Sequence, residues 1–246
     1  MKKLVAYITS CYPEKSFSID LALSLKENGV DTLELGVPFS DPVADGVLIE
    51  RASHKALELG FKFEHLLDIS KEIAPKIDTL WMGYFNSFYQ QDMNKLVPYA
   101  REIGVNGFII PDLPHEESLT YSKLFNSNNI SNISFVAPTD SDKRIKEIVK
   151  DAKKFIYMVA YTGITGSGNA ENLQSFLSSI KKYTKTPTYV GFGVNEQTAK
   201  DKVKGADGVI VGSAFMNILL KDDLSYEQKI IKCSELSKII KEKINT

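Results

Sequence analysis

The sequence predicts a single-domain (β/α)8 barrel, or TIM barrel, over residues 1–246. Short apolar segments and helical patterns alternate from one end of the chain to the other. Turns of small residues follow the last three apolar segments, where barrels of this kind often bind phosphate. The length of 246 residues also fits one such barrel, which takes roughly 250 residues.

The predicted strands are rich in β-branched and aromatic residues, and many are apolar almost throughout. This pattern is typical of parallel strands that are covered by other elements on both faces. The strands are predicted at Leu4–Ser10, Thr32–Val37, Thr79–Phe85, Gly107–Pro111, Ile133–Ala137, Phe155–Ala160, Thr188–Gly193 and Gly208–Gly212.

Helical periodicity follows the strands. We expect Ser18 to cap a helix that continues through Leu25 and stops at Asn28-Gly29. An open, doubly wound sheet is the alternative fold, but the first strand lacks the G-x-G-x-x-G turn common there. The other helices are predicted at Val47–Leu59, Glu64–Ile73, Met93–Ile103, Glu116–Phe125, Lys143–Ala152, Asn172–Tyr183, Glu196–Val203 and Tyr226–Ile244.

Composition argues against several function classes. The 30 basic residues are balanced by 31 acidic residues, whereas a nucleic-acid-binding protein usually carries a basic excess. No apolar run reaches the roughly 18 residues that span a bilayer, and no signal peptide precedes the first strand. The two cysteines and three histidines lack metal-ligand spacing, so no metal site is predicted. We expect a cytoplasmic protein without nucleic-acid or membrane partners.

Glu34 is the first candidate for catalysis, because barrel chemistry occurs at the carboxyl ends of the strands. Leu33 and Leu35 share one face of the second strand, so Glu34 points to the other. Burial in the barrel interior would raise the pKa of this carboxyl group and suit it for proton transfer near neutral pH. A structural ion pair inside the barrel is the alternative.

The loop after this strand, Ser40–Gly46, carries two further carboxylates, Asp41 and Asp45. A carboxylate beside Glu34 would create the unequal environments that separate a proton donor from a charge-stabilising group. Alternatively, the two aspartates form Asx turns or cap the helix that begins near Val47. We favour this second interpretation for Asp41.

Turns of small residues follow the last three strands, at Thr162–Gly168, Gly191–Gly193 and Val211–Ala214. Glycine leaves backbone N–H groups unobstructed, and phosphate binds such groups near the N-terminus of a helix. Together the three turns predict a phosphate site across the barrel mouth. The composition of Thr162–Gly168 also suits a loop that closes over bound ligand.

Several apolar and aromatic residues near the same rim could line a pocket for an aromatic ring. The candidates are Phe39, Met82, Tyr84, Tyr157 and Phe192, although each could belong to the core instead. The residues alone therefore predict a barrel that binds a phosphorylated, partly apolar substrate and that needs no cofactor of its own. Asp112 lies on the same rim and could bind ligand, face a partner or turn the chain.

The run Leu33–Gly46, LELGVPFSDPVADG, resembles the signature of tryptophan synthase α subunits. Order and spacing also agree at Pro111–Pro114, Gly163–Gly166, Gly191–Gly193 and Val211–Ala214, so the resemblance covers nearly the whole chain. It implies a lyase of tryptophan biosynthesis that splits indole-3-glycerol phosphate into indole and glyceraldehyde 3-phosphate. It also implies an α2β2 complex in which the β subunit alone holds pyridoxal phosphate.

The resemblance assigns roles to individual positions. Glu34 and Asp45 match the family's catalytic pair. The substrate-binding positions match Tyr7, Met82, Tyr84, Tyr157, Thr165, Gly166, Phe192, Gly193, Gly212 and Ser213.

Three features depart from the family pattern, and the first is Tyr12, which stands where the family often has an acidic residue before proline. Only Met1–Lys3 precede the first strand, where the family commonly has a helix, and Tyr161-Thr162 stands where the lid usually begins with Arg-Ser. Two rival functions are another phosphate-binding barrel isomerase or epimerase and a non-catalytic regulatory barrel. An epimerase would normally need metal-ligating histidines at strand ends, and a regulatory barrel would not need Glu34 and Asp45.

Overall fold

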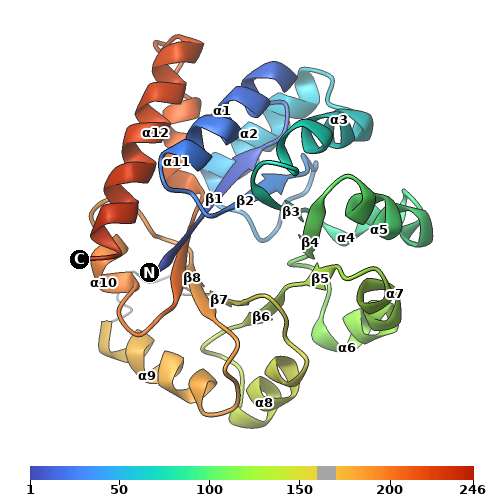
Figure 1. The fold of residues 1–246 in the computed structure, drawn as a ribbon, viewed down its shortest axis with the longest axis vertical. Coiled ribbons are helices and arrows are strands. Elements are labelled where there is room, and N and C mark those ends of the chain that lie inside the picture. The colour runs from blue at the N-terminus through green and yellow to red at the C-terminus, as the bar shows by residue number, and fades with distance from the viewer. Residues whose placement is uncertain (160–169) are drawn as a thin grey trace.

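The computed structural model describes residues 1–159 and 170–246, except for the side chains of 170–172. Its strands form a central parallel barrel and its helices form a ring around them (Figure 1). The strands are β1 Lys3–Thr9, β2 Thr32–Gly36, β3 Asp78–Met82, β4 Val105–Ile109, β5 Ser131–Asn132, β6 Ser134–Val136, β7 Ile156–Val159, β8 Thr188–Gly191 and β9 Gly208–Val211.

The order of these strands in the sheet confirms the predicted (β/α)8 barrel. The sheet runs β5-β4-β3-β2-β1-β9-β8-β7-β6, and every pair is parallel. β5 and β6 are two pieces of one strand interrupted at Ile133, whose N–H still donates to the carbonyl oxygen of Phe108 at 2.9 Å. This strand pairs with β4 on one side and β7 on the other, so the sheet closes on itself.

The helices cover the outside of the barrel. Among them, the short α11 follows β9 after the single residue Gly212. The helices are α1 Lys15–Glu27, α2 Val47–Glu58, α3 Phe63–Ile73, α4 Phe85–Tyr89, α5 Met93–Glu102, α6 His115–Ser118, the 3-10 helix η1 Leu119–Tyr121, α7 Ser122–Ser127, α8 Asp142–Lys150, α9 Ala170–Lys181, α10 Ala199–Lys202, α11 Ser213–Leu219 and α12 Tyr226–Lys243.

The start predicted for the first helix was wrong. Helix α1 begins at Lys15, so Ser18 lies inside its first turn rather than at the cap. The Ser18 hydroxyl donates to the carbonyl oxygen of Glu14 at 3.0 Å and accepts from the N–H of Cys11 at 3.0 Å. Its polar group therefore ties the end of the first strand to the helix. The predicted end was right, because Gly29 follows the helix with φ of 101°.

The predicted helix Glu116–Phe125 was also wrong, because the chain forms α6, η1 and α7 there. Neither α6 nor η1 buries a residue, and the first buried side chain of this stretch is Phe125. The Ser118 hydroxyl donates to the carbonyl oxygen of His115 at 2.7 Å, a local bond that competes with a continuous helix. Without an apolar face against the barrel, a long helix has little to stabilise it here.

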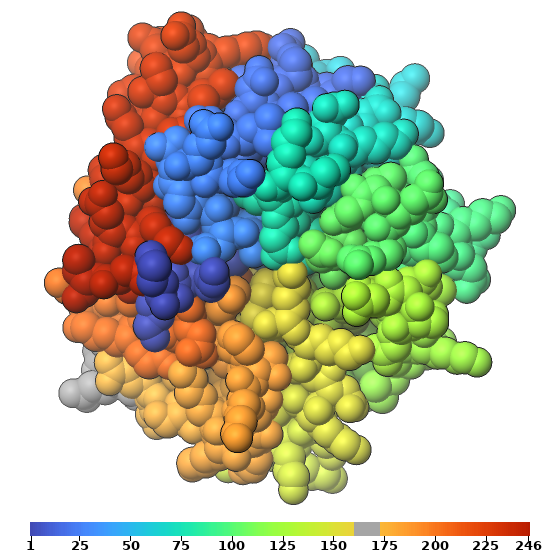
Figure 2. Space-filling model, viewed as in Figure 1, coloured from blue at the N-terminus to red at the C-terminus, as the bar shows by residue number. Residues whose placement is uncertain are grey.

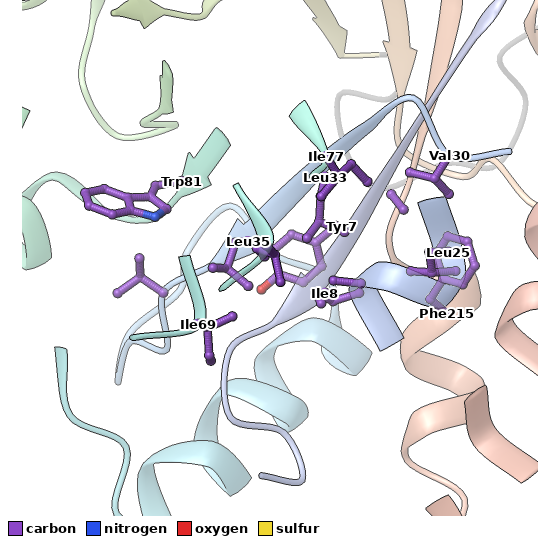
Figure 3. Packing of buried hydrophobic residues seen from close by; sticks show 14 of the residues in the cluster. Tyr7, Ile8, Leu25, Val30, Leu33, Leu35, Ile69, Ile77, Trp81 and Phe215 are labelled. Carbon is purple, nitrogen blue, oxygen red and sulfur yellow. The ribbon is translucent and has the colours of Figure 1, made fainter. Parts of the chain in front are cut away.

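Apolar side chains form two layers, one between the strands and the helices and one inside the barrel. On the helix side, Leu33 and Leu35 of β2 lie in one cluster with Ile8 of β1 and Leu25 of α1 (Figure 3). On the inner side, the other strands contribute a smaller cluster of Val5, Leu80, Ile109, Ile133, Phe155, Tyr157, Tyr189 and Ile210. β2 adds no apolar residue to this inner cluster, because its middle inward-facing position is occupied by Glu34.

Ion pairs close the amino ends of the strands. Asp31 accepts hydrogen bonds from Lys3 at 2.9 Å and from the N–H of Leu4 at 2.8 Å, and it also pairs with Lys241 of α12. The backbone N–H of Lys2 donates to the side-chain oxygen of Asn245 at 2.8 Å. Figure 2 shows this face, with the dark blue N-terminal residues beside the dark red C-terminal end.

Asp78 forms a second such cluster at the same end. It accepts hydrogen bonds from Thr32 at 2.7 Å, Asn106 at 2.8 Å and Lys154 at 2.8 Å, which come from three different parts of the barrel. The carboxylates at this end are therefore structural.

Among the described helices, none combines the length and apolar composition that crossing a lipid bilayer requires.

Candidate active site

A pocket opens at the carboxyl ends of the strands, opposite the ion pairs. The space between its walls, counted out to the open solvent at the mouth, is about 680 Å³. Its walls are largely apolar and aromatic, with two carboxylates and several glycines set among them. The lining residues are Tyr7, Glu34, Ala44, Asp45, Gly46, Ile49, Met82, Ile109, Pro111, Phe135, Tyr157, Phe192, Gly193, Val194, Ile210, Gly212 and Ser213.

Glu34 lies on the inner wall of this pocket. Its neighbours across the sheet are Tyr7 of β1 and Leu80 of β3. The residue is only 2% exposed, and its Oε1 atom has no hydrogen-bond partner among the described residues. Burial, together with the negative charge of Asp45, raises the pKa of Glu34 to about 8. Glu34 is therefore protonated at neutral pH and free to donate a proton.

The alternative interpretation of Glu34 as half of an ion pair finds no support. Of the described cationic side chains, none lies within ion-pairing distance of its carboxyl group. A buried carboxyl group without a partner lowers stability, and such groups concentrate at functional sites. Its position is therefore better explained by chemistry than by packing.

Asp45 is held beside Glu34 by Tyr84. The Tyr84 hydroxyl accepts a hydrogen bond from the N–H of Ala44 at 2.9 Å and donates one to the Asp45 carboxylate. Burial raises the pKa of Asp45 to about 6, while the bond from Tyr84 lowers it. Asp45 thus loses its proton before Glu34 does, and at neutral pH the pair carries one negative charge on Asp45.

Tyr84, predicted to bind substrate, is not among the described residues that line the pocket. Its ring stacks on Phe39 with centroids 5.1 Å apart and an interplanar angle of 19°, beneath the loop that carries Asp45. Phe39 is likewise absent from the lining of the pocket. The two rings support the loop that carries Asp45.

The two other aspartates on the rim have different surroundings. Asp41 is exposed and accepts a hydrogen bond from the hydroxyl of Ser40. Helix α2 begins at Val47 with Gly46 as its cap and no side-chain cap bond, so the expectation that an aspartate caps it was wrong. Asp112 accepts a hydrogen bond from the N–H of Phe85 at 2.8 Å and so fixes the start of α4.

Two tyrosines flank Glu34 because glycines make room for them. A Cβ atom at Gly36 would lie 2.3 Å from the hydroxyl oxygen of Tyr7, and one at Gly191 would lie 2.2 Å from the ring of Tyr157. Burial and the charge of Asp45 raise the pKa of Tyr7 well above its usual value, and burial and the charges of Glu34 and Asp45 do the same for Tyr157. Both hydroxyls therefore stay protonated. The sequence predicts Gly191 only as part of a phosphate turn, and the structure shows that it also makes room for Tyr157.

Aromatic rings form one wall of the pocket. Phe135 stacks on Tyr157 with centroids 4.8 Å apart and an interplanar angle of 28°, and Phe192 meets Tyr157 edge-on at 6.1 Å. Tyr7, Met82, Tyr157 and Phe192 therefore lie where the sequence placed them. The apolar lining residues that sequence reasoning missed are Ile49, Ile109, Pro111, Phe135, Val194 and Ile210.

Backbone amides gather at the other end of the pocket. The N–H groups of Gly193, Gly212 and Ser213 donate to no acceptor within the described part of the chain. Gly193 has φ of 65°, a conformation that glycine adopts readily. These amides are therefore free for an anionic group. The third predicted turn, Thr162–Gly168, with Thr165 and Gly166, falls outside the described residues.

The pocket can donate a proton from Glu34, hold a partial positive charge against Asp45 and accept an anion on backbone amides. Within residues 1–159 and 170–246, no group of three or more His, Cys, Asp or Glu side chains is arranged to hold a metal ion. The fold and pocket thus define the class: a (β/α)8-barrel protein with a poised acid–base pair and an apolar cleft leading to free amides.

The comparison with protein families is specific. The family described as tryptophan synthase alpha chain matches residues 1–245, and the chain belongs to this family. It is therefore the α subunit of an enzyme of tryptophan biosynthesis. The comparisons give no support to an unrelated isomerase, an epimerase or a regulatory barrel.

Individual relatives agree over their full lengths. The chain is 51% identical to the tryptophan synthase alpha chain of Wolinella succinogenes, covering 100% of this chain and 97% of the relative. Tryptophan synthase subunit alpha from Campylobacter jejuni superposes with a TM-score of 0.87 and 34% identity, covering 96% of this chain and 95% of that one. Ligand-free tryptophan synthase from M. tuberculosis gives a TM-score of 0.89 at 26% identity, covering 100% and 94%.

Proposed function

We propose that this chain cleaves indole-3-glycerol phosphate into indole and glyceraldehyde 3-phosphate by a retro-aldol reaction. The observation that carries the proposal is the pair of carboxyl groups in the pocket, with Glu34 unpartnered and protonated and Asp45 ionised. The reaction needs a proton donor at indole C3 and a negative group that stabilises a cationic ring. The two carboxyl groups supply one each.

The proton moves in two steps. Protonated Glu34 delivers its proton to C3 of the indole ring, which becomes tetrahedral and leaves a positive charge on the ring system. The resulting Glu34 carboxylate then removes the proton from the hydroxyl group next to the ring. The carbon–carbon bond breaks, its electron pair returns to the ring as neutral indole, and the hydroxyl carbon becomes an aldehyde.

Asp45 stabilises the charge that develops between these steps. Its carboxylate accepts a hydrogen bond from the ring N–H, which strengthens as the ring becomes cationic. The wall of Phe135, Tyr157 and Phe192 holds the ring and excludes water around the carboxyl groups. The amides of Gly193, Gly212 and Ser213 hold the phosphate, so the bond to be broken stays within reach of Glu34. The family resemblance adds Thr165 as the loop residue that contacts Asp45 on closure, and Gly166 as a further member of the phosphate cradle.

A β subunit is the proposed partner, in an α2β2 complex whose β subunits alone hold pyridoxal phosphate. Exposed apolar side chains near the pocket mouth support an interface there. Val43 is 85% exposed and Val47 is 77% exposed, on the loop and helix that follow β2, and Tyr89 is 60% exposed on α4. The cytoplasm is the proposed location.

Incubation of the purified chain with indole-3-glycerol phosphate tests the proposed reaction. We expect indole and glyceraldehyde 3-phosphate to form in equal amounts, faster when a β subunit is added. Glu34→Gln and Asp45→Asn are the matched controls, since each removes one ionisable group and keeps the shape. Intact substrate after prolonged incubation with wild-type chain and β subunit would reject the proposal.

A further inference from the structure

Lys202, the last residue of α10, lies directly behind the turn that carries the free amide of Gly193. Its ammonium group donates a hydrogen bond to the carbonyl oxygen of Phe192 at 2.9 Å. The Nζ atom also lies 3.2 Å from the position that a Cβ atom on Gly193 would occupy. Lys202 is half-buried, whereas its helix neighbour Lys200 is exposed.

The ammonium group has no anionic partner in the described part of the chain. No carboxylate lies within 4.0 Å of it there, whereas Lys204, two residues further on, pairs with Asp201 at 2.7 Å. Partial burial lowers the pKa of Lys202, as expected for a cation removed from water without a compensating charge. A half-buried cation held only by a neutral carbonyl is unfavourable unless an anion arrives.

The hydrogen bond to Phe192 determines where the next amide points. The C=O of Phe192 and the N–H of Gly193 belong to one planar trans peptide, so they point in opposite directions. Because the C=O points at the ammonium group, the N–H of Gly193 points away from it. A positive charge on the carbonyl side also polarises the peptide and makes its N–H a stronger donor.

We propose that Lys202 is a positioning residue for the phosphate group of the substrate. It fixes and polarises the Phe192–Gly193 peptide so that the Gly193 amide faces the anion, and it places a positive charge behind a cradle otherwise built from backbone. This inference rests on the proposed function, which supplies the phosphate. Lys202 acts through the peptide and does not touch the reacting atoms.

A purely structural role for Lys202 is already filled by a neighbour. The hydroxyl of Thr198 donates to the carbonyl oxygen of Gly193 at 2.8 Å and accepts from the N–H of Asn195 at 3.0 Å. These neutral bonds hold the turn without any charge. The feature that Lys202 adds is the positive charge, and the experiment must therefore separate charge from shape.

Kinetics of the full-length chain with three variants make this separation. Lys202→Met removes the charge and keeps most of the length, Lys202→Arg keeps the charge, and Lys200→Met is the matched control on the exposed face of the same helix. The measurements are KM and kcat for indole-3-glycerol phosphate, with inhibition constants for glycerol 3-phosphate and for indole. The first inhibitor carries the phosphate without the ring and the second carries the ring without the phosphate.

For Lys202→Met we expect KM and the inhibition constant of glycerol 3-phosphate to rise about tenfold, as for the loss of one charge-assisted hydrogen bond. The inhibition constant of indole and kcat should stay near their wild-type values, because the ring and the carboxyl groups are untouched. Lys202→Arg should recover most of the affinity, and Lys200→Met should match wild type.

Unchanged binding of glycerol 3-phosphate by Lys202→Met would overturn the inference, as would an equal loss of indole binding. If Lys202→Met does not fold, Lys202→Gln keeps a donor for the Phe192 carbonyl without the charge, and wild-type affinity in that variant would overturn it equally. The proposed function fails separately, through absence of indole release by the wild-type chain. Glycerol 3-phosphate binding would still test Lys202 in that case.

Discussion

The two ends of the barrel use carboxylates in opposite ways. At the amino ends of the strands, Asp31 accepts hydrogen bonds from Lys3, Lys241 and a backbone amide. At the carboxyl ends, Glu34 is more deeply buried and has no such partner for Oε1 among the described residues. Asp31 and Glu34 stand only three positions apart in the sequence: Asp31 directly precedes β2, and Glu34 is the middle residue of that strand. Their surroundings, and not their residue type, separate structure from chemistry.

The pKa values follow from this difference. Burial alone would raise the pKa of Asp31, but the bonds from Lys241, Leu4 and Lys3 outweigh it, and the pKa lies below its ordinary value of 3.8. Burial of Glu34 meets no opposing bond, and its pKa rises to about 8. The charges at the amino ends of the strands therefore stabilise the fold. At the carboxyl ends, Glu34 lowers the stability of the fold but keeps a proton available.

Replacing Glu34 with Gln is expected to have the largest effect on turnover. The amide keeps the shape of the carboxyl group but cannot donate or remove a proton. Indole release should fall by at least about a thousandfold, within the range that proton-transfer groups contribute. Substrate binding, measured by competition with glycerol 3-phosphate, should change only slightly. Turnover within tenfold of wild type would show that another group transfers the proton.

The same variant should be more stable than wild type at neutral pH. Folding raises the pKa of Glu34 from 4.5 to about 8. The stability that this shift contributes is fully present below pH 4.5 and is lost as the pH rises toward 8. Gln carries no such dependence, so Glu34→Gln should gain about 1 to 3 kcal/mol at pH 7 and little at pH 4. Urea unfolding at both pH values measures the difference.

Replacing Asp45 with Asn should reduce kcat/KM by about a hundredfold, because the cationic ring loses its counter-charge. In wild type, activity requires ionised Asp45 and protonated Glu34, so the pH profile should rise near 6 and fall near 8. Without the negative charge at position 45, the pKa of Glu34 falls. The alkaline limb of the variant should therefore move below 8, and an unmoved limb would show that the two groups do not interact.

The sequence predicted the barrel well because its strands are buried on both faces. Segments such as Gly208–Gly212 are apolar almost throughout, as expected for strands of a covered parallel sheet. Helices without a buried face were harder to predict, as the division of the predicted helix Glu116–Phe125 into three short helices shows. Side-chain bonds to the backbone, such as that of Ser118, decide such segments and leave no periodic signal.

The candidate site was predictable where one strand or one turn carries the information. The alternation Leu33-Glu34-Leu35 places the carboxyl group inward, and the glycines near β8 and β9 mark the free amides. Phe135 was missed because the alternation in Ile133–Ala137 does not say which face of the strand is inward; in the structure Phe135 packs on the inner side with Ile133. The place of Tyr84 beneath Asp45 depends on how two loops meet, which no local pattern encodes. Tyr7 was predicted from the family resemblance, whereas its place beside Glu34 becomes visible only once β1 and β2 are paired.

Replacing Asp31 with Asn tests the ion pairs at the amino ends of the strands. The variant keeps a polar group but loses the charge that binds Lys3 and Lys241, so we expect a loss of about 1 to 2 kcal/mol of stability at pH 7. Because the pKa of Asp31 is lowered on folding, its contribution is present above 3.8 and is lost as pH falls through the folded value. Indole release should be unchanged.

Asp68→Asn is the matched control for this measurement. Asp68 pairs with Lys15 at 3.1 Å on the exposed surface, where screening by solvent leaves little net stabilisation. Equal stability losses in Asp31→Asn and Asp68→Asn would show that the closure of the barrel at its amino end does not depend on Asp31.

Tyr84→Phe should give the smallest effect. It tests why Asp45 is ionised while Glu34 stays protonated. The variant keeps the ring against Phe39 but removes the hydroxyl that donates to Asp45 and accepts from Ala44. Since that bond lowers the pKa of Asp45, its loss should move the acid limb of the pH profile upward from about 6 by up to roughly one unit. The alkaline limb of the profile should remain near 8, because it reports the titration of Glu34. Tyr89→Phe, which alters an exposed tyrosine of α4, should leave both limbs in place. An acid limb that moves in both variants, or in neither, would remove Tyr84 as the group that keeps Asp45 ionised beside a protonated Glu34.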